Sequence, residues 1–150
     1  MKRFILIILF GLFLSGTTSC KKEKCPSPPE PTVFDYLTMD AWQYQCMATE
    51  RDGQAIGVTG FSGWERVFTP SGDYYLYNNN GNTVDYGNYE FDSGVNPMTL
   101  SVYSRGSSTP VIYTIRTLTK DSLVYYNEEQ QGGHTYRYTY FHIRQKEEND

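Results

Sequence analysis

Histidine, cysteine and basic residues are scarce in this sequence, and their scarcity excludes several kinds of site. The two histidines and three cysteines show no metal-ligand spacing, so we expect no metal ion and no cofactor. Lys and Arg number 13 against 17 Asp and Glu, which gives a net charge of −4. Without a basic stripe, neither nucleic acid nor an anionic lipid surface is an expected electrostatic partner.

The sequence also lacks an apolar run long enough to cross a bilayer. Phe4–Leu14 has eleven residues, all apolar except Gly11, whereas a transmembrane helix needs about 20. Lys2 and Arg3 precede this run, and five small residues follow it up to Cys20. This order of charged, apolar and small residues predicts a signal peptide at residues 1–19.

The junction at Cys20 resembles a bacterial lipobox, in which the cysteine after a small residue is lipidated and becomes the first mature residue. Thr17 stands where such boxes usually have leucine. The resemblance implies an outer-membrane lipoprotein of the cell envelope, attached to the membrane by acyl chains such as palmitate on Cys20. The alternative is an ordinary secretory signal followed by a chance cysteine.

Cleavage before Cys20 would leave 131 of the 150 residues, enough for one domain, with a net charge of about −6. Residues 20–36 begin with charges and prolines and predict an extended tether. The pair Lys22-Glu23 resembles the short surface-export signals of Bacteroidetes-type lipoproteins. Lys24 replaces their second acidic residue, so an orientation toward the periplasm or the cell surface is left open.

Cys25 and Cys46 would share an oxidising compartment, where a disulfide is permitted. The strand pattern nevertheless places Cys46 toward the core beside Trp42 and Tyr44, as a small buried apolar residue. Whether Cys25 and Cys46 form a disulfide or stay unpaired is left open.

Residues 37–145 predict an all-β domain, followed by a charged tail at 146–150. Tyrosine is abundant, with 14 copies, and clusters of Gly, Asn, Asp and Ser recur between short apolar stretches. A short helical turn is expected only around residues 31–39, and the glycine-rich segment 57–63 is expected to be a loop. Eight strands are expected, at 41–49, 64–69, 74–77, 83–91, 98–103, 111–118, 122–126 and 134–144. Sequential hairpins favour an eight-stranded antiparallel up-and-down barrel, with a two-sheet sandwich as the alternative.

Four segments together resemble the lipocalin-like lipoproteins of Bacteroidetes type, with small calycin-like barrels. They are Trp42, the hairpin Phe68–Tyr74, Gly87–Tyr89, and the hairpin Tyr113–Leu123 with its Leu-Thr-Lys-Asp turn. Their order and spacing carry the resemblance, which covers about residues 37–145. It implies a cup-shaped barrel that holds a small hydrophobic ligand.

In lipocalins the first strand opens with Gly-x-Trp, and a basic residue late in the chain packs over the tryptophan. Asp40 replaces the glycine here, and Trp42 is kept. A closed meander brings the start of the first strand beside the end of the last strand, so we expect Arg144 to lie over Trp42. The pair Trp42 and Arg144 would close one end of the barrel as a structural element.

An eight-stranded barrel is just wide enough for side chains to fill it or for one small ligand. The alternation of strand residues gives the following candidates for a ligand cavity: Tyr44, Phe68, Tyr89, Phe91, Tyr113, Ile115, Leu123 and Tyr125. Because most of these side chains are large, a filled interior is the alternative. The protein would then be a structural or interaction module that binds a protein or glycan partner through exposed aromatic strips.

One such strip is Tyr136, Tyr138 and Tyr140, which fall on one face of the last expected strand. They would either pack inward with hydroxyls at the barrel mouth or form an outer ladder, and packing against Tyr125 or Tyr126 is the plainer interpretation.

No catalytic constellation stands out, and we expect the protein not to be an enzyme. Residues 60–63, Gly-Phe-Ser-Gly, lack the spacing of a nucleophile elbow. Glu128 and Glu129 are expected in a hairpin turn, and neither His134 nor His142 has an acid or nucleophile suggested beside it.

Overall fold

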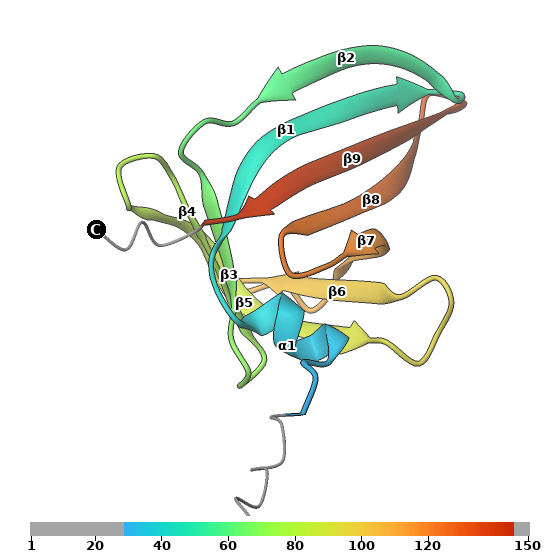
Figure 1. Ribbon diagram of the computed structural model, residues 1–150. Coiled ribbons are helices and arrows are strands. Elements are labelled where there is room, and N and C mark those ends of the chain that lie inside the picture. The colour runs from blue at the N-terminus through green and yellow to red at the C-terminus, as the bar shows by residue number, and fades with distance from the viewer. Residues whose placement is uncertain (1–28, 146–150) are drawn as a thin grey trace, which may run out of the picture.

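The computed structural model describes residues 29–145, which form one short helix and nine strands (Figure 1). The signal peptide, Cys20, Cys25 and the tail at 146–150 lie outside the described residues. The elements are α1 (Val33–Thr38), β1 (Trp42–Arg51), β2 (Gln54–Gly60), β3 (Glu65–Phe68), β4 (Asp73–Tyr77), β5 (Thr83–Asp92), β6 (Thr99–Ser104), β7 (Val111–Leu118), β8 (Ser122–Gln131) and β9 (His134–Arg144).

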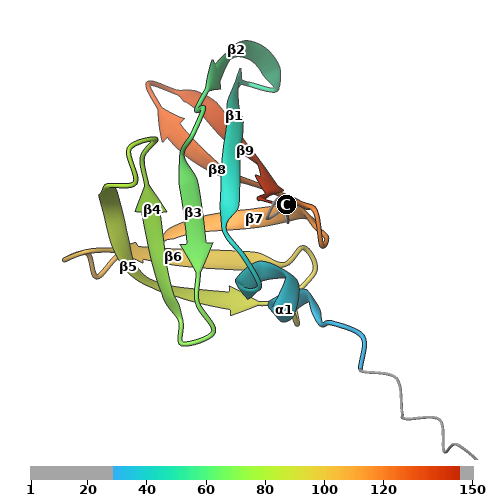
Figure 2. The same ribbon diagram turned by 60° about the vertical axis from the view of Figure 1, so that its left-hand side comes forward.

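The strands close into an eight-stranded antiparallel barrel with one additional strand, which confirms the predicted fold class. From β3 to β9 each strand pairs with the next along the chain, and β1 closes the circle by pairing with both β9 and β3 (Figure 2). Residues 41–49 and 134–144 are therefore neighbours in one sheet, as an up-and-down barrel requires and a two-sheet sandwich does not.

Helix α1 covers one end of the barrel, which we call the closed end (Figure 2). The helix begins at a capping box, in which Thr32 and Asp35 satisfy each other's backbone N–H groups. Leu37 is fully buried, and its carbonyl oxygen accepts a hydrogen bond of 2.9 Å from the indole Nε1 of Trp42. The helix and the first strand are thereby fixed to each other over the core.

A close approach of two strands explains the Gly-Asn-Tyr motif. A Cβ atom at Gly87 would collide with the carbonyl oxygen of Tyr103 on β6 and would lie 3.2 Å from the ring of Tyr74. Gly87 pairs with Tyr74 in the β4–β5 ladder, so its missing side chain leaves room for that ring. The glycine is thus required by packing.

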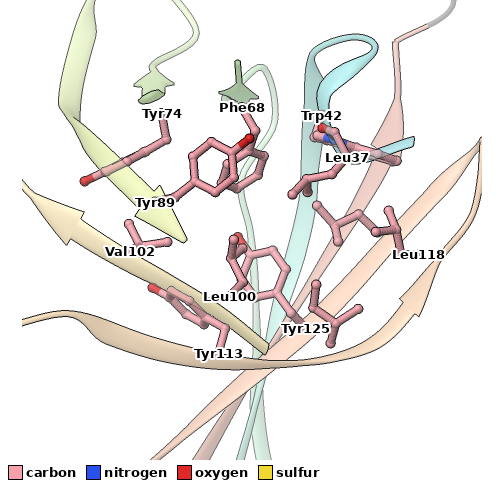
Figure 3. Close-up of a cluster of buried hydrophobic side chains, with 12 residues drawn as sticks. Leu37, Trp42, Phe68, Tyr74, Tyr89, Leu100, Val102, Tyr113, Leu118 and Tyr125 are labelled. Atoms are coloured by element: carbon pink, nitrogen blue, oxygen red, sulfur yellow. Dashed lines mark hydrogen bonds between the residues drawn. The ribbon is translucent and has the colours of Figure 1, made fainter. Parts of the chain in front are cut away.

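The core is unusually rich in aromatic side chains, and Figure 3 shows several of them converging between the strands. Seven of the 13 buried hydrophobic residues are Trp, Tyr or Phe. The buried set is Leu37, Trp42, Tyr44, Phe68, Tyr74, Tyr89, Leu100, Val102, Tyr113, Ile115, Leu118, Leu123 and Tyr125. Aromatic rings of this size occupy much of a barrel of eight short strands.

Four strands extend beyond the barrel at the end opposite α1, which we call the open end (Figure 1). β7 pairs with β8 only as far as Tyr126, and β3 pairs with β1 only at Trp42 and Gln43. The remainders of β8, β9, β1 and β2 form a curved sheet of their own, the projecting sheet, made of residues 46–51, 54–60, 127–131 and 134–140.

Two parts of the projecting sheet correct the sequence prediction. Residues 57–60 of the segment 57–63, which was expected as a loop, belong to β2. Their backbone pairs with β1 although every residue of β2 is exposed. β8 continues to Gln131 instead of ending at Tyr126, so Glu128 and Glu129 are strand residues paired with β9. Residues 128–131 contain no Gly, Pro, Asn, Asp or Ser, and pairing with neighbouring strands rather than burial determines the ends of β8 and the whole of β2.

The direction of Cys46 was also predicted wrongly. The β1–β9 register shifts between Tyr44 and Cys46, which is the mark of a β-bulge. The bulge reverses the alternation, so Cys46 lies opposite Phe141 while Met47 lies opposite Tyr140. Cys46 is half-buried on the face that turns away from the core.

Candidate functional site

A buried arginine lies inside the barrel. Arg66 stands on β3 between Trp42 of β1 and Leu76 of β4, and it shares the inward face with Phe68. Only 7% of its surface is exposed. None of the ion pairs among residues 29–145 includes Arg66, so its charge has no carboxylate partner there.

Aromatic rings surround the guanidinium group. Its Cζ lies 5.8 Å from the ring centre of Tyr125, 5.9 Å from that of Tyr74 and 6.0 Å from that of Tyr113. One terminal nitrogen donates a hydrogen bond of 2.7 Å to the Tyr125 hydroxyl, while the buried Nε–H has no acceptor. The far end of Tyr74 reaches an acid, because its hydroxyl donates to Asp85 at 2.6 Å.

Three tyrosines of the cluster around Arg66 are neutral and cannot serve as counterions. Burial raises the pKa of the Tyr44, Tyr125 and Tyr140 hydroxyls above their ordinary range. Their rings pack edge-on or tilted, with Tyr140 centred 5.3 Å from Tyr125 and 5.9 Å from Tyr44. The interior therefore presents phenol rings and hydroxyls to a single uncompensated positive charge.

His142 completes this cluster. It is 1% exposed, its ring is stacked 5.1 Å from Tyr125, and its Nε2 lies 3.4 Å from the Tyr125 hydroxyl. Burial first, and then the charge of Arg66, hold the pKa of His142 well below its usual value. The imidazole is therefore neutral at physiological pH and adds no second positive charge.

An aromatic strip leads from this cluster along the inner face of the projecting sheet. Tyr136, Tyr138 and Tyr140 alternate on β9 and lie opposite Glu129, Asn127 and Tyr125 of β8, respectively. The rings of Tyr136 and Tyr138 are stacked at 6.5 Å and half-exposed, whereas Tyr140 packs into the core. The strip thus faces the inside of the barrel, and its outer end at Tyr136 is open to solvent. At its inner end Tyr140 packs against Tyr125, as the sequence favoured.

Asn127 is another polar residue with an unsatisfied buried atom, as are Arg66 and His142. It is 7% exposed, and its Oδ1 has no hydrogen-bond partner. Its amide nitrogen lies 3.4 Å from Glu129. Buried polar atoms without partners are uncommon in folded proteins, and each one requires an explanation such as a bound water, a bound ion or local strain.

The segment between β2 and β3 runs along the edge of β1, with hydrogen bonds from the Tyr44 N–H to the Trp64 carbonyl oxygen at 2.8 Å and from the Phe61 N–H to the Gln45 carbonyl oxygen at 3.2 Å. A pocket of about 580 Å³ lies there, lined by Gln43, Tyr44, Gln45 and residues 60–63. Phe61 packs edge-on against Tyr44 at 4.7 Å and against Trp64 at 5.9 Å. Gly63 permits this turn, because its φ is +76° and a Cβ would lie 2.8 Å from Asn79.

The closed end holds a different arginine. The Arg144 guanidinium lies 5.0 Å from the Trp42 ring, donates to the Tyr36 carbonyl oxygen at 2.8 Å and forms an ion pair of 3.3 Å with Asp40. Asp40 thereby supplies the negative partner. This cluster joins α1, β1 and β9 and is structural.

The predicted cavity residues all contribute to the interior, and Phe91 alone among them is only half-buried. Phe91 stacks on Phe34 of α1 at 6.4 Å. The other seven, Tyr44, Phe68, Tyr89, Tyr113, Ile115, Leu123 and Tyr125, are buried. That they line a ligand site remains a prediction.

Sequence reasoning missed Arg66, Asn127 and Phe61. The alternation that turns Phe68 inward also turns Arg66 inward, and this signal was present in the sequence. Asn127 could not be found, because the strand was expected to end before it. Phe61 was considered only as part of a possible nucleophile turn.

The remaining charged candidates are solvated. His134 contacts Asp52 at 2.6 Å, and Arg137 contacts Glu128 at 2.7 Å and lies over Tyr126, all near the exposed end of the projecting sheet. Within residues 29–145 no group of three His, Cys, Asp or Glu side chains is placed to hold a metal ion. The described part of the chain also contains no helix with the length and apolar character needed to span a bilayer.

Comparison with protein-family models found no match, and a search of curated proteins found no significant relative.

Proposed function

We propose that this protein is a non-enzymatic, lipid-anchored protein of the cell envelope whose lipocalin-like barrel binds a small hydrophobic ligand at its open end. The observation that carries the proposal is the aromatic strip, which runs from the half-exposed pair Tyr136 and Tyr138 to the partly buried Tyr140 that packs against the core. The stacked rings are half-exposed and continue into the core. They therefore offer apolar surface to a ligand while the rest of the interior stays covered.

The test measures binding of an uncharged fluorescent probe, N-phenylnaphthylamine, to the mature chain from residue 20 carrying Cys20→Ser. We expect saturable binding that Tyr138→Ser weakens, because the probe would lose its stacking partner. Tyr103→Ser is the matched control, since Tyr103 bonds to Glu90 across the outer face. Absence of saturable binding, or equal loss in both variants, would contradict ligand binding at the strip.

Native mass spectrometry of the same chain, purified from a bacterial periplasm, identifies co-purified molecules. We expect a bound mass of small-molecule size that denaturation releases.

Lipid anchoring is tested separately with the full-length chain. Cys20→Ser should release the protein from the membrane fraction or leave it unprocessed, because the acyl chains are the proposed attachment. Cys46→Ser is the control, and it should remain membrane-bound. A Cys20→Ser protein that is correctly cleaved and still membrane-bound would refute the lipoprotein assignment.

A second candidate function is an interaction module with a filled interior, which binds a protein or glycan through the same exposed tyrosines. The seven buried aromatic residues favour a filled core. In that case the probe would not bind, whereas a glycan array or cross-linking in intact cells would identify a partner whose binding Tyr136→Ser and Tyr138→Ser reduce.

A further inference from the structure

We propose that Arg66 binds the negative head group of a single-chain amphiphile, a carboxylate or a phosphate ester, whose apolar chain lies along Tyr138 and Tyr136. This inference rests on the proposed ligand-binding function and adds the chemical class of the ligand. It starts from the charge of Arg66, which no other feature of the barrel explains.

A buried arginine normally has an acidic partner, because moving an ion out of water costs several kcal/mol. Arg66 has only rings and a neutral phenol around it within residues 29–145. Arginine stays protonated in proteins, so the charge cannot be lost by titration. A bound anion would supply the missing partner.

The donors of Arg66 are not all used within the described part of the chain. Its Nε–H has no acceptor, and the terminal nitrogen that bonds to Tyr125 is paired with a neutral oxygen. Carboxylates and phosphates accept two parallel hydrogen bonds from the planar guanidinium group. The neighbouring hydroxyls of Tyr125 and Tyr113 could donate to the same anion.

The distance along the strip sets the size of the ligand. Tyr140, whose ring lies 5.3 Å from Tyr125, marks the inner end of the strip, and Tyr136 lies four residues toward solvent. At about 3.3 Å per residue, this path is about 13 Å long. Decanoate has an extended chain of comparable length.

The approach to Arg66 favours one negative group at the end of an apolar chain. Glu129 lies opposite Tyr136 at the outer end of the strip. This carboxylate would repel a second negative charge at the far end of the ligand. A ligand with acids at both ends would bind less well.

The test compares decanoate, decyl phosphate and decanol as competitors of N-phenylnaphthylamine on the mature chain with Cys20→Ser. We expect at least one of the two anions to bind about tenfold to a hundredfold more tightly than decanol, as a charge-assisted hydrogen bond predicts. The two anions distinguish the two head groups. Arg66→Met should abolish the preference for an anion over decanol, and Arg66→Lys should restore part of that preference.

Arg105→Met is the matched control, because Arg105 also lies over a tyrosine, Tyr86 at 5.2 Å, but is exposed. Arg105→Met should leave the affinities for decanoate, decyl phosphate and decanol unchanged. Decanol binding as tightly as both anions would overturn this proposal and leave the ligand-binding function intact, whereas failure of the probe and all three competitors would overturn both. If Arg66→Met does not fold, the affinities of the anions and of decanol are compared in the wild type and in Arg66→Lys, and a preference that the wild type lacks would overturn the proposal in the same way.

Discussion

Replacing Arg66 by methionine should leave the free protein as stable as before, or make it more stable. The substitution removes a charge but keeps a long unbranched side chain that fills similar space. It deletes the hydrogen bond from Arg66 to Tyr125 and the contacts with three aromatic rings. The Tyr125 hydroxyl retains a neighbour, His142 Nε2 at 3.4 Å.

The opposing contributions can be compared from the structure. The ring centres lie 5.8–6.0 Å from Cζ, at the outer limit of cation–π attraction, so together the three contacts stabilise by about 1.5 kcal/mol. A hydrogen bond from a charged donor contributes about 1.5–3 kcal/mol. Desolvation of an unpaired ion costs several kcal/mol, which equals or exceeds these gains. We therefore expect the free energy of unfolding to be unchanged or to rise by up to about 2 kcal/mol.

Urea denaturation followed by tryptophan fluorescence measures this difference, with equal m-values required for the comparison. Leu100→Ala is the control for an ordinary core position and should lose about 2–5 kcal/mol, since Leu100 is fully buried. A loss of more than about 2 kcal/mol in Arg66→Met would refute the reasoning, because the arginine would then be a net structural contributor.

Three further predictions concern the fold. Trp42→Ala should lower the free energy of unfolding by about 3–5 kcal/mol, and Arg144→Ala should lower it by less. Chemical denaturation of the double mutant should show a coupling energy of about 0.5–3 kcal/mol, whereas additive losses would contradict the contact between the two side chains. Gly87→Ala should lower the melting temperature strongly because its Cβ would collide with the next strand, whereas Gly60→Ala, with open space around it, should be nearly neutral; equal effects would contradict the packing argument. The pKa of His142 is lowered in the folded state, so as pH falls the unfolded chain is protonated before the folded protein. The free energy of unfolding should therefore decrease below about pH 6.5, by at most about 1.4 kcal/mol per pH unit. His142→Gln should show a smaller decrease between about pH 7.5 and about pH 5.5 in parallel denaturation curves, and an unchanged decrease would assign the effect to other groups.

The closure of the barrel could be predicted from sequence because local signals agreed. Turn residues separated the apolar stretches at regular intervals, and sequential hairpins leave few topologies. The position of Arg144 over Trp42 follows from closure alone, since the first and last strands must meet. The acidic partner of Arg144 did not follow, because Asp40 lies before the first strand and reaches Arg144 only after α1 has packed.

The projecting sheet was not predictable in the same way. β2 is exposed along its whole length, so it carries no pattern of burial, and its pairing with β1 determines its structure. The bulge at Gln45 shifts the register by one residue, which a regular alternation cannot anticipate. For that reason Cys46 was assigned to the wrong face.

Arg144 and Arg66 both lie over aromatic rings, but only Arg144 has an acidic partner within the described residues. Arg144 has an Nε–H without a partner, as Arg66 does, but its other nitrogens reach a carboxylate and a backbone carbonyl oxygen. Its charge is thus compensated by the chain itself, and removing Arg144 should only weaken the closed end. Arg66 has equivalent rings and no oxygen anion, and it lies where the aromatic strip meets the core. A charge that the chain leaves uncompensated at the inner end of an open apolar surface is best explained by an anion from outside.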